Sequence, residues 1–517
     1  MTEKKRIVLN TVATYGRSLF ALALGLFSSR WILLSLGQSD FGLYGVVGSL
    51  IVFITFINNV MSGAVGRFYA YSIGRGKTLG EQEAFADLAN WFNTALSIHF
   101  FLMVLLFCVG MPLGEYAVKN WLVIPSDRMD ACVWVFRLSI IATFTSVASV
   151  PYKAMFQAHQ YIAELSVVGM LRSLVQFCFS YAILSVEMDR LIFYASFMTF
   201  IHVGFDSILT FWAMHKFRSC RILLKEWYDL GRMRQFFTFA GSKLLGGVCV
   251  LMRNEGGALL VNRYFSPVVN AACSISMQVT GHASSLSSAL VGALQPAIAY
   301  RAGSKDRIGL LRYADATCRM ASLLVILLSI PLLAEMQYVL ELWLKNPPPD
   351  ARLFCSVAII SLLVDKASVG YMLAANAYGE KIVFYEIVNG LLLMASFPLT
   401  LVVFHLSYGV FSMQMCLLAT YALYTLARVN FCRWQMGVSV LAWIFKTAFP
   451  VGIVAGAAYL AGIFWQCVMA PSFNRLLLTT GTSFLVAIVT GWWFLIHANE
   501  RQVLMQKFLW ATGSRRS

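Results

Sequence analysis

Two arginines, Arg17 and Arg30, lie within the first apolar stretch of the chain, about residues 8–36. A cation at the centre of a bilayer costs about 3 kcal/mol on insertion scales, so it is kept only where it faces protein, water or an anion. A guanidinium group binds phosphate or carboxylate through paired hydrogen bonds. The two residues therefore indicate recognition of an anion within a membrane, although Arg30, near the end of its stretch, could instead extend to the interface.

The excess of cations over acids continues along the chain. Lys243 and Arg253 lie deep in their apolar stretch, and we expect them to line a cavity. Four other cations stand near the ends of stretches or at uncertain depth, and we interpret them as interface anchors: Arg137, Arg172, Arg319 and Lys446.

The embedded acids are fewer, and each is a candidate for carrying a coupling proton. His202 and Asp206 are four residues apart and therefore share one helix face, whereas Glu255 is two residues from Arg253 and does not face it. Asp365 lies beside Lys366. The alternative for each of these groups is a local structural pair.

The composition is that of an α-helical membrane protein. Of the 517 residues, 59% are hydrophobic and only 12% are charged, about half the charged fraction of a soluble protein. The apolar runs have the length of membrane helices and lack the alternation of barrel strands. The net charge of +16 does not require a nucleic-acid partner in a membrane protein, and we expect none. The cysteines and histidines show no metal-ligand spacing, so no metal or cofactor is predicted.

Hydropathy predicts about fourteen membrane helices. Lysine and arginine are concentrated in the loops on the N-terminal side of the membrane, which places both termini in the cytoplasm. No loop is long enough for a soluble catalytic domain, so we do not expect an enzyme. The predicted spans are 8–36, 42–66, 88–112, 131–152, 161–185, 191–214, 235–261, 267–299, 313–334, 353–376, 382–404, 408–429, 443–466 and 476–497.

An internal repeat relates the two halves of the chain. Residues 148–158 and 367–377, at the ends of the fourth and tenth spans, share the letters A-S-V-x-Y and a final alanine. A weaker match sets Arg17 against Lys243. Chance similarity between small-residue helices is the alternative. The repeat predicts two parallel six-helix lobes related by a pseudo-two-fold axis, as in transporters that rock around a central cleft. The predicted parts are 1–215, a cytoplasmic linker 216–234, 235–434, and 435–517 with two further helices.

Three features carry a resemblance to a known family. They are the basic N-terminus leading into the first span, the segment Leu36–Tyr44 (LGQSDFGLY), and the segment Gly66–Lys77 (GRFYAYSIGRGK). Together with fourteen spans, they resemble the polysaccharide branch of the MOP flippase superfamily, the Wzx-type flippases. The resemblance implies movement of undecaprenyl-pyrophosphate-linked oligosaccharides across the bacterial inner membrane for O-antigen, capsule or exopolysaccharide synthesis. Membrane lipids, a glycan polymerase and other assembly proteins are the implied partners.

The resemblance gives the embedded cations a ligand. A cavity formed mainly by the first, second, seventh and eighth spans would hold the pyrophosphate, a compact multiple anion. Polar residues on the second and eighth spans would contact sugar hydroxyls, although the serines among them also permit close helix packing. The predicted binding residues are Arg17, Arg30, Lys243, Arg253, Asn58, Asn59, Gln278 and His282.

Other functions remain open at this point. A multidrug and toxin extrusion antiporter of the same superfamily takes cations and needs acids in its cavity, and the four cavity spans hold only Glu255. A lipid II flippase recognises the same anion and fits the same residues. A membrane-bound glycan polymerase or ligase needs a large catalytic loop, and a scaffold needs no buried cations, so the sequence disfavours both.

Overall fold

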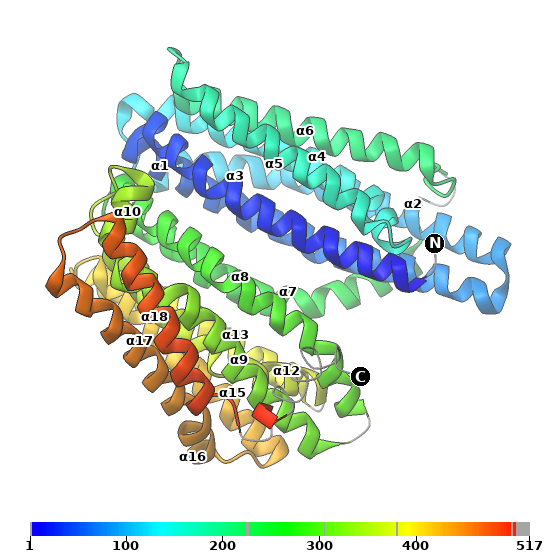
Figure 1. Ribbon diagram of the computed structural model, residues 1–517. Helices are drawn as coiled ribbons and strands as arrows, with labels where there is room; N and C mark the ends of the chain where they lie inside the picture. The colour runs from blue at the N-terminus through cyan, green and yellow to red at the C-terminus, as the bar shows by residue number, and fades with distance from the viewer. Residues whose placement is uncertain (1–2, 224–226, 304–305, 379–380, 498–499, 503–517) are drawn as a thin grey trace, which may run out of the picture. The chain divides into compact units, whose positions relative to one another are not determined.

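The computed structural model describes residues 3–223, 227–303, 306–378, 381–497 and 500–502, and these residues form helices and connecting turns without strands (Figure 1). The all-α expectation is confirmed. The helices are α1 (Glu3–Leu79), α2 (Glu81–Leu105), α3 (Met111–Tyr116), α4 (Met129–Ala158), α5 (Ile162–Ala182), α6 (Arg190–Lys216), α7 (Leu230–Tyr264), α8 (Pro267–Gly303), α9 (Arg307–Ala334), α10 (Met336–Leu344), α11 (Ala351–Lys366), α12 (Val369–Tyr378), α13 (Ile382–Met394), α14 (Ser396–His405), α15 (Phe411–Met436), α16 (Val440–Trp443), α17 (Phe449–Val468) and α18 (Phe473–Phe494).

The lengths and composition of these helices fit a multi-pass membrane protein. Within the described residues, ten helices are long and apolar enough to cross a bilayer, or up to 11 if the bent pair α11 and α12 forms one span. The other predicted spans lie on the second part of α1 and on α7 and α8, helices of sufficient length but more polar sequence. Lower hydropathy is expected of helices that face a polar interior rather than lipid.

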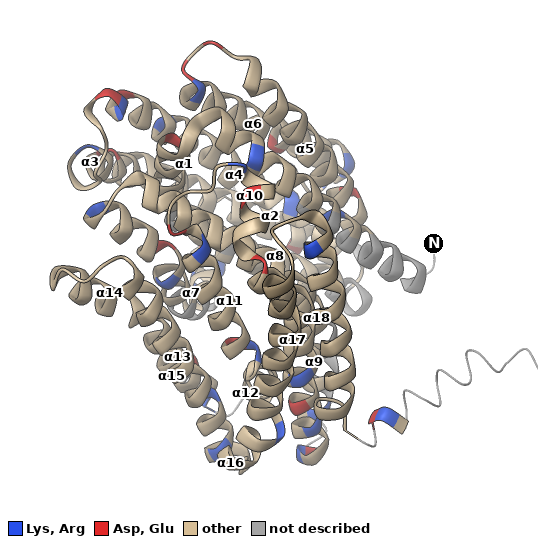
Figure 2. Cartoon of the chain, turned by 60° about the vertical axis from the view of Figure 1, so that its left-hand side comes forward, with Lys and Arg blue, Asp and Glu red and all other residues tan. Residues whose placement is uncertain are grey.

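Large apolar side chains are exposed over much of the surface. Phe200, Phe445 and Leu460 each expose about two thirds or more of their area. In Figure 2 most of the ribbon is tan, and acidic and basic residues are sparse along the helices. An outward-facing apolar surface is stable in lipid, where association of helices depends on packing and polar contacts instead of on the hydrophobic effect.

Gly37 bends α1 at the point where the sequence predicts a turn between the first two spans. Its φ of 75° and ψ of 171° depart from the helix and lie where glycine meets no Cβ penalty. The first and second predicted spans are therefore two helical segments of α1 that meet at Gly37. In Figure 1 the label of α2 and the N-terminus, where α1 begins, lie on the same side of the first unit.

A chain of ion pairs lies just beyond the kink. Arg128 donates from Nε to Asp40 Oδ1 (2.9 Å) and from Nη1 to Asp189 Oδ2 (2.8 Å). Asp189 also accepts from the backbone N–H groups of Leu191 and Ile192 and so caps α6. Burial opposes ionisation of Asp189, but the hydrogen bonds from Arg128 and the backbone outweigh it and lower the pKa of the carboxyl group. The pairs tie α1 to the starts of α4 and α6.

The chain divides into two compact units. The first comprises Met1–Ala271 together with Trp343–Pro348, and the second comprises Ala272–Leu342 and Pro349–Ser517. In the first unit, α1 packs on α2, α4, α5 and α7, and α4 packs on α6. Its buried cluster includes Tyr69, Phe92, Phe156 and Phe236. The predicted boundaries at residues 215, 234 and 434 stay a prediction.

The second unit is organised around α9. This helix packs on α11, α12, α17 and α18, and α15 packs on α11 to α14. A buried ion pair, Arg475 with Glu335 (2.6 Å), joins α18 to the residue that follows α9, and Thr479 donates to the same carboxylate. The two C-terminal helices are thus bound into this unit by a desolvated charge pair as well as by apolar packing.

Gly42 provides a test of the packing in the first unit. A Cβ added there would overlap the carbonyl group of Pro267 and approach the N atom of Ala271 to 3.2 Å, and Asn270 Nδ2 donates to the Gly42 carbonyl (3.0 Å). We expect Gly42→Val to displace the start of α8 from α1 and to lower the melting temperature and folded yield strongly, because backbone cannot move aside as a side chain can.

Gly63, also on α1, is the control, because a Cβ added there meets nothing within 4 Å. Gly63→Ala is expected to keep or slightly raise the melting temperature. Thermal unfolding of the purified protein followed by a thiol-reactive dye measures both. Equal melting temperatures for Gly42→Val and wild type would contradict the close approach.

Candidate functional site

A single buried carboxylate gathers charged side chains from three helices of the first unit. Asp206 on α6 is 2% exposed. Lys153 on α4 donates to its Oδ1 atom (2.8 Å), and Nη1 of Arg172 on α5 lies 3.8 Å from the same atom. One acid thus faces two cations, and the shorter contact belongs to Lys153, so the charge of Arg172 is compensated only in part.

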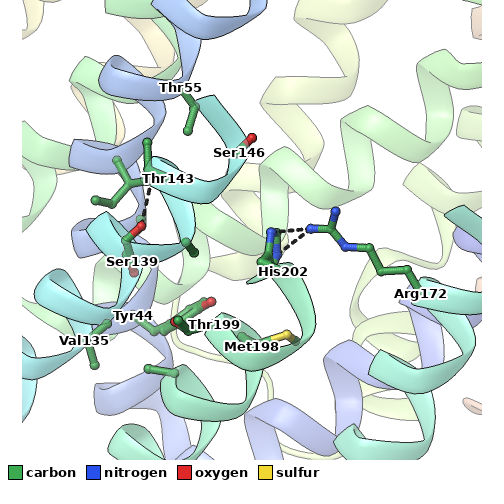
Figure 3. Close-up of a pocket in the computed structure, with 14 residues that line it drawn as sticks. Tyr44, Thr55, Val135, Ser139, Thr143, Ser146, Arg172, Met198, Thr199 and His202 are labelled. Carbon is green, nitrogen blue, oxygen red and sulfur yellow. Dashed lines mark hydrogen bonds between the residues drawn. The ribbon is translucent and has the colours of Figure 1, made fainter. Parts of the chain in front are cut away.

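His202 lies one helical turn before Asp206 and contacts Arg172. The Nη2 atom of Arg172 lies 2.7 Å from His202 Nε2 (Figure 3). The predicted shared face of His202 and Asp206 therefore points toward α5, and both residues meet Arg172. An imidazole ring carries no negative charge in either protonation state, so it does not add to the compensation of the arginine.

Arg17 approaches the same face of α5. A Cβ added at Gly169 would lie 2.8 Å from Arg17 Cδ, so the arginine stem occupies the space that glycine leaves open. Gly169 and Arg172 are three residues apart and neighbours on the helix surface. The structure therefore places Arg17 of α1 along the same strip of α5 as Arg172, within a cation-rich region that we call the Asp206 cluster: Arg17, Lys153, Arg172, His202 and Asp206.

A cavity of about 280 Å³ opens beside this cluster within the first unit (Figure 3). Arg172 and His202 stand at one side, and hydroxyl side chains from α1, α4 and α6 form much of the rest. The lining residues are Tyr44, Gly48, Ile51, Thr55, Val135, Ser139, Ala142, Thr143, Ser146, Arg172, Ala195, Met198, Thr199 and His202.

The sequence contains a signal for this cavity that the prediction missed. Ser139, Thr143 and Ser146 recur at the spacing of one helix face in an otherwise apolar stretch. Lys153 falls just after the predicted span 131–152, but it lies inside α4 and pairs with Asp206. Arg172 was interpreted as an interface anchor, but it is half-buried beside the cavity.

The other predicted residues of the first unit lie outside the cavity lining. Asn58 is buried and donates from Nδ2 to Ser146 Oγ (3.3 Å), while its Oδ1 atom has no hydrogen-bond partner among the described residues. Glu255 of α7 lies within hydrogen-bonding reach of Ser49 of α1. Arg30 is half-buried, and Arg253 donates to Asn254 (2.9 Å). The side chains of Lys243 and Asn59 lie outside the described residues.

The predicted residues of the second unit do not form one group. Gln278 and His282 lie half-buried on α8. Asp365 accepts from Arg428 Nη1 (2.8 Å) and lies 3.4 Å from Lys366 Nζ. Arg428 is 3% exposed and lies inside α15, and this pairing favours the structural alternative for Asp365.

Two further cations differ from their predicted setting. Arg319 was interpreted as an interface anchor, but it is 1% exposed and donates to the Leu495 carbonyl (2.7 Å) and Glu500 (2.6 Å). Arg475 was assigned to a loop, but it lies buried in α18. In both cases the partner is far away in sequence, and a pattern read along the chain does not reveal it.

Comparison with known proteins gives the fold. No family model and no curated protein matches the sequence. The structure is similar to the lipid II flippase MurJ in an inward closed conformation, with a TM-score of 0.66, 11% identity and coverage of 93% of this chain and 98% of that one. It is also similar to an inward-facing MATE family multidrug resistance transporter, with a TM-score of 0.64, 12% identity and coverage of 81% and 94%.

A third similar structure is a MOP superfamily transporter from Pyrococcus furiosus Vc1, described as having a binding pocket of reverse polarity. Its TM-score is 0.56, with 12% identity and coverage of 85% of this chain and 96% of that chain. The chain therefore has the fold of MOP superfamily transporters.

The Asp206 cluster yields a stability prediction. Asp206→Asn leaves Lys153 and Arg172 without an anion, and we expect a loss of about 3–5 kcal/mol, the range for breaking a buried ion pair. Adding Lys153→Met to Asp206→Asn removes one of the unpaired charges and should recover part of that loss.

Lys119→Gln, at an exposed pair with Glu115, is the control and should cost at most about 1 kcal/mol. Chemical unfolding in detergent measures all three; equal losses for Asp206→Asn and Lys119→Gln would contradict the cluster.

Proposed function

We propose that this protein is a MOP-type flippase that moves undecaprenyl-pyrophosphate-linked oligosaccharides across the bacterial inner membrane by alternating access. The observation that carries the proposal is the cation excess of the Asp206 cluster, in which Lys153 and Arg172 share one carboxylate and Arg17 lies against Gly169, one turn from Arg172 on α5. A membrane protein retains buried cations at a cost, and an anionic substrate that visits them offsets that cost.

The cluster suits a pyrophosphate on physical grounds. Guanidinium groups bind phosphate oxygens through two parallel hydrogen bonds, and an ammonium group acts as a point charge. Lys153 and Arg172 already compete for one carboxylate, so an arriving anion gains a partner without breaking the shorter Lys153–Asp206 contact. Under this proposal the side chain of Arg172 reorients toward the substrate, and Lys153 keeps its contact with Asp206.

The setting follows from the same proposal. We place the chain in the bacterial inner membrane with both termini cytoplasmic, as the distribution of lysine and arginine between loops favours. The lobes would be residues 1–215 and 235–434, with 216–234 as linker and 435–517 as two further helices. The substrate would enter from the cytoplasmic leaflet, where lipid-linked sugars are assembled, and a glycan polymerase and other assembly proteins would receive it on the other side.

A lipid II flippase is the second candidate. Similarity to MurJ supports this alternative, and lipid II carries the same pyrophosphate. A cation-extruding antiporter is supported by the similarity to MATE transporters, but two cations around Asp206 repel a cationic drug. The oligosaccharide flippase and the lipid II flippase would bind the same pyrophosphate, so they differ in the sugar part of their substrates.

A deletion strain tests the function. Without the protein, lipid-linked repeat units should accumulate in the cytoplasmic leaflet and surface polysaccharide should fall, because the sugar head group does not cross a bilayer unaided. Leaflet location is measured by the access of an impermeant sugar-oxidising reagent to spheroplasts. Normal surface glycan in the deletion strain would refute the proposal, and loss of peptidoglycan precursors with intact surface glycan would favour the lipid II alternative.

Arg17 tests the head-group site. We expect Arg17→Ala to lower export of repeat units at least tenfold in the complemented deletion strain, because one charge-assisted hydrogen bond contributes about 1.5–3 kcal/mol. Lys243→Ala is predicted to act similarly. Arg218→Ala, at an exposed arginine after α6, is the matched control and should restore export. Membrane abundance of each variant is checked by immunoblot, and full export by well-expressed Arg17→Ala would exclude Arg17 from the site.

A further inference from the structure

The cavity beside the Asp206 cluster has two chemically different ends. At one end Arg172 presents a guanidinium group whose charge is partly compensated, since Lys153 holds Asp206 at the shorter distance. Arg172 is the only lysine, arginine or acid among the lining residues that the structure describes. This end therefore attracts an anionic group and repels a cation.

The wall opposite offers hydrogen-bond acceptors. Three lining threonines have already donated their only hydroxyl hydrogen to main-chain carbonyl groups. Their bonds are Thr55 to Val52 (3.1 Å), Thr143 to Ser139 (2.8 Å) and Thr199 to Leu138 (3.1 Å). Their oxygen atoms remain as acceptors, so the wall suits a ligand that donates several hydrogen bonds.

The cavity is small. Its volume of about 280 Å³ lies near the lower end of the range of about 300–1,000 Å³ for small-molecule sites. It has room for one ring-sized ligand and not for an extended drug. An apolar molecule would strand the polar groups of the wall, at a cost for each unpaired group.

We propose that this cavity binds one sugar residue that carries an acidic group, with Arg172 pairing the acid and the threonine oxygens accepting from the sugar hydroxyls. The inference rests on the proposed function and narrows it, because the transported oligosaccharide would then contain an acidic sugar. The acid is a carboxylate or a phosphate, which share the bidentate chemistry of arginine.

The test is a direct binding measurement on the full-length protein in lipid nanodiscs by isothermal titration. The probes are D-glucuronate, D-glucose 1-phosphate, D-glucose, inorganic phosphate and L-serine. We expect one of the acidic sugars to bind at least tenfold more tightly than glucose, phosphate and serine, and the tighter of the two identifies the acid. If glucose binds as tightly as the acidic sugars, Arg172 does not pair an acid in this cavity. If phosphate or serine binds as tightly as the acidic sugars, the cavity does not recognise a sugar.

Variants separate the two ends of the cavity. Arg172→Gln should reduce binding of the acidic sugar to the level of glucose, while Asp206 keeps Lys153 as partner. Thr143→Val preserves shape, lies away from the charge cluster, and should weaken both acidic and neutral sugars roughly two- to tenfold. Arg218→Gln is the control and should bind as wild type does. Unchanged binding in folded Arg172→Gln or Thr143→Val would reject the site.

The outcome is distinguishable from failure of the proposed function, because binding requires no transport. Failure of both acidic sugars to bind, with lipid-linked units still accumulating in the deletion strain, would remove the site and leave the flippase proposal standing. Tight binding of an acidic sugar together with normal export in the deletion strain would refute the flippase proposal and leave the binding site standing.

Discussion

The burial of Asp206 between two cations is the constraint on which the first unit depends. A carboxylate that is 2% exposed within membrane helices is retained only if cations and hydrogen bonds surround it. Lys153 and Arg172 meet that requirement from α4 and α5, so three helices are joined at one point by charge. The positions of the cavity wall and of Arg17 follow from the same packing of α1 against α4 and α5.

The second unit meets the same constraint with the charges exchanged. In the first unit the cation stands on α4 and the acid on α6, whereas in the second the acid Asp365 stands on α11 and the cation Arg428 on α15. The matching segments, 148–158 and 367–377, lie at the end of α4 and across the break between α11 and α12. Under the predicted repeat these are equivalent helices. The ion pair would then be preserved as a means of joining two helices, while its polarity is free to differ.

The sequence predicts the fold class and most helices well because lipid imposes a strong rule: a spanning segment must be long, apolar and internally hydrogen-bonded. It predicts the shared face of His202 and Asp206 because that depends only on helical spacing. It does not predict their partners. Lys153 and Arg172 come from other helices than Asp206. Lys153 and Arg475 fall just outside the predicted spans because hydropathy near a helix end does not distinguish a solvated cation from one that pairs with a buried acid.

The kink at Gly37 connects these features. Before it, Arg17 of α1 lies against Gly169 of α5, and after it Tyr44, Gly48 and Thr55 of the same helix line the cavity. The Arg128 ion pairs with Asp40 and Asp189 hold the chain just beyond the bend. A positive φ at Gly37 is available to glycine without strain, so the chain can turn there while the ion pairs hold the second part of α1 to the starts of α4 and α6. The two contacts proposed for this helix, with an anion through Arg17 and with a sugar through the cavity wall, therefore fall on opposite sides of Gly37.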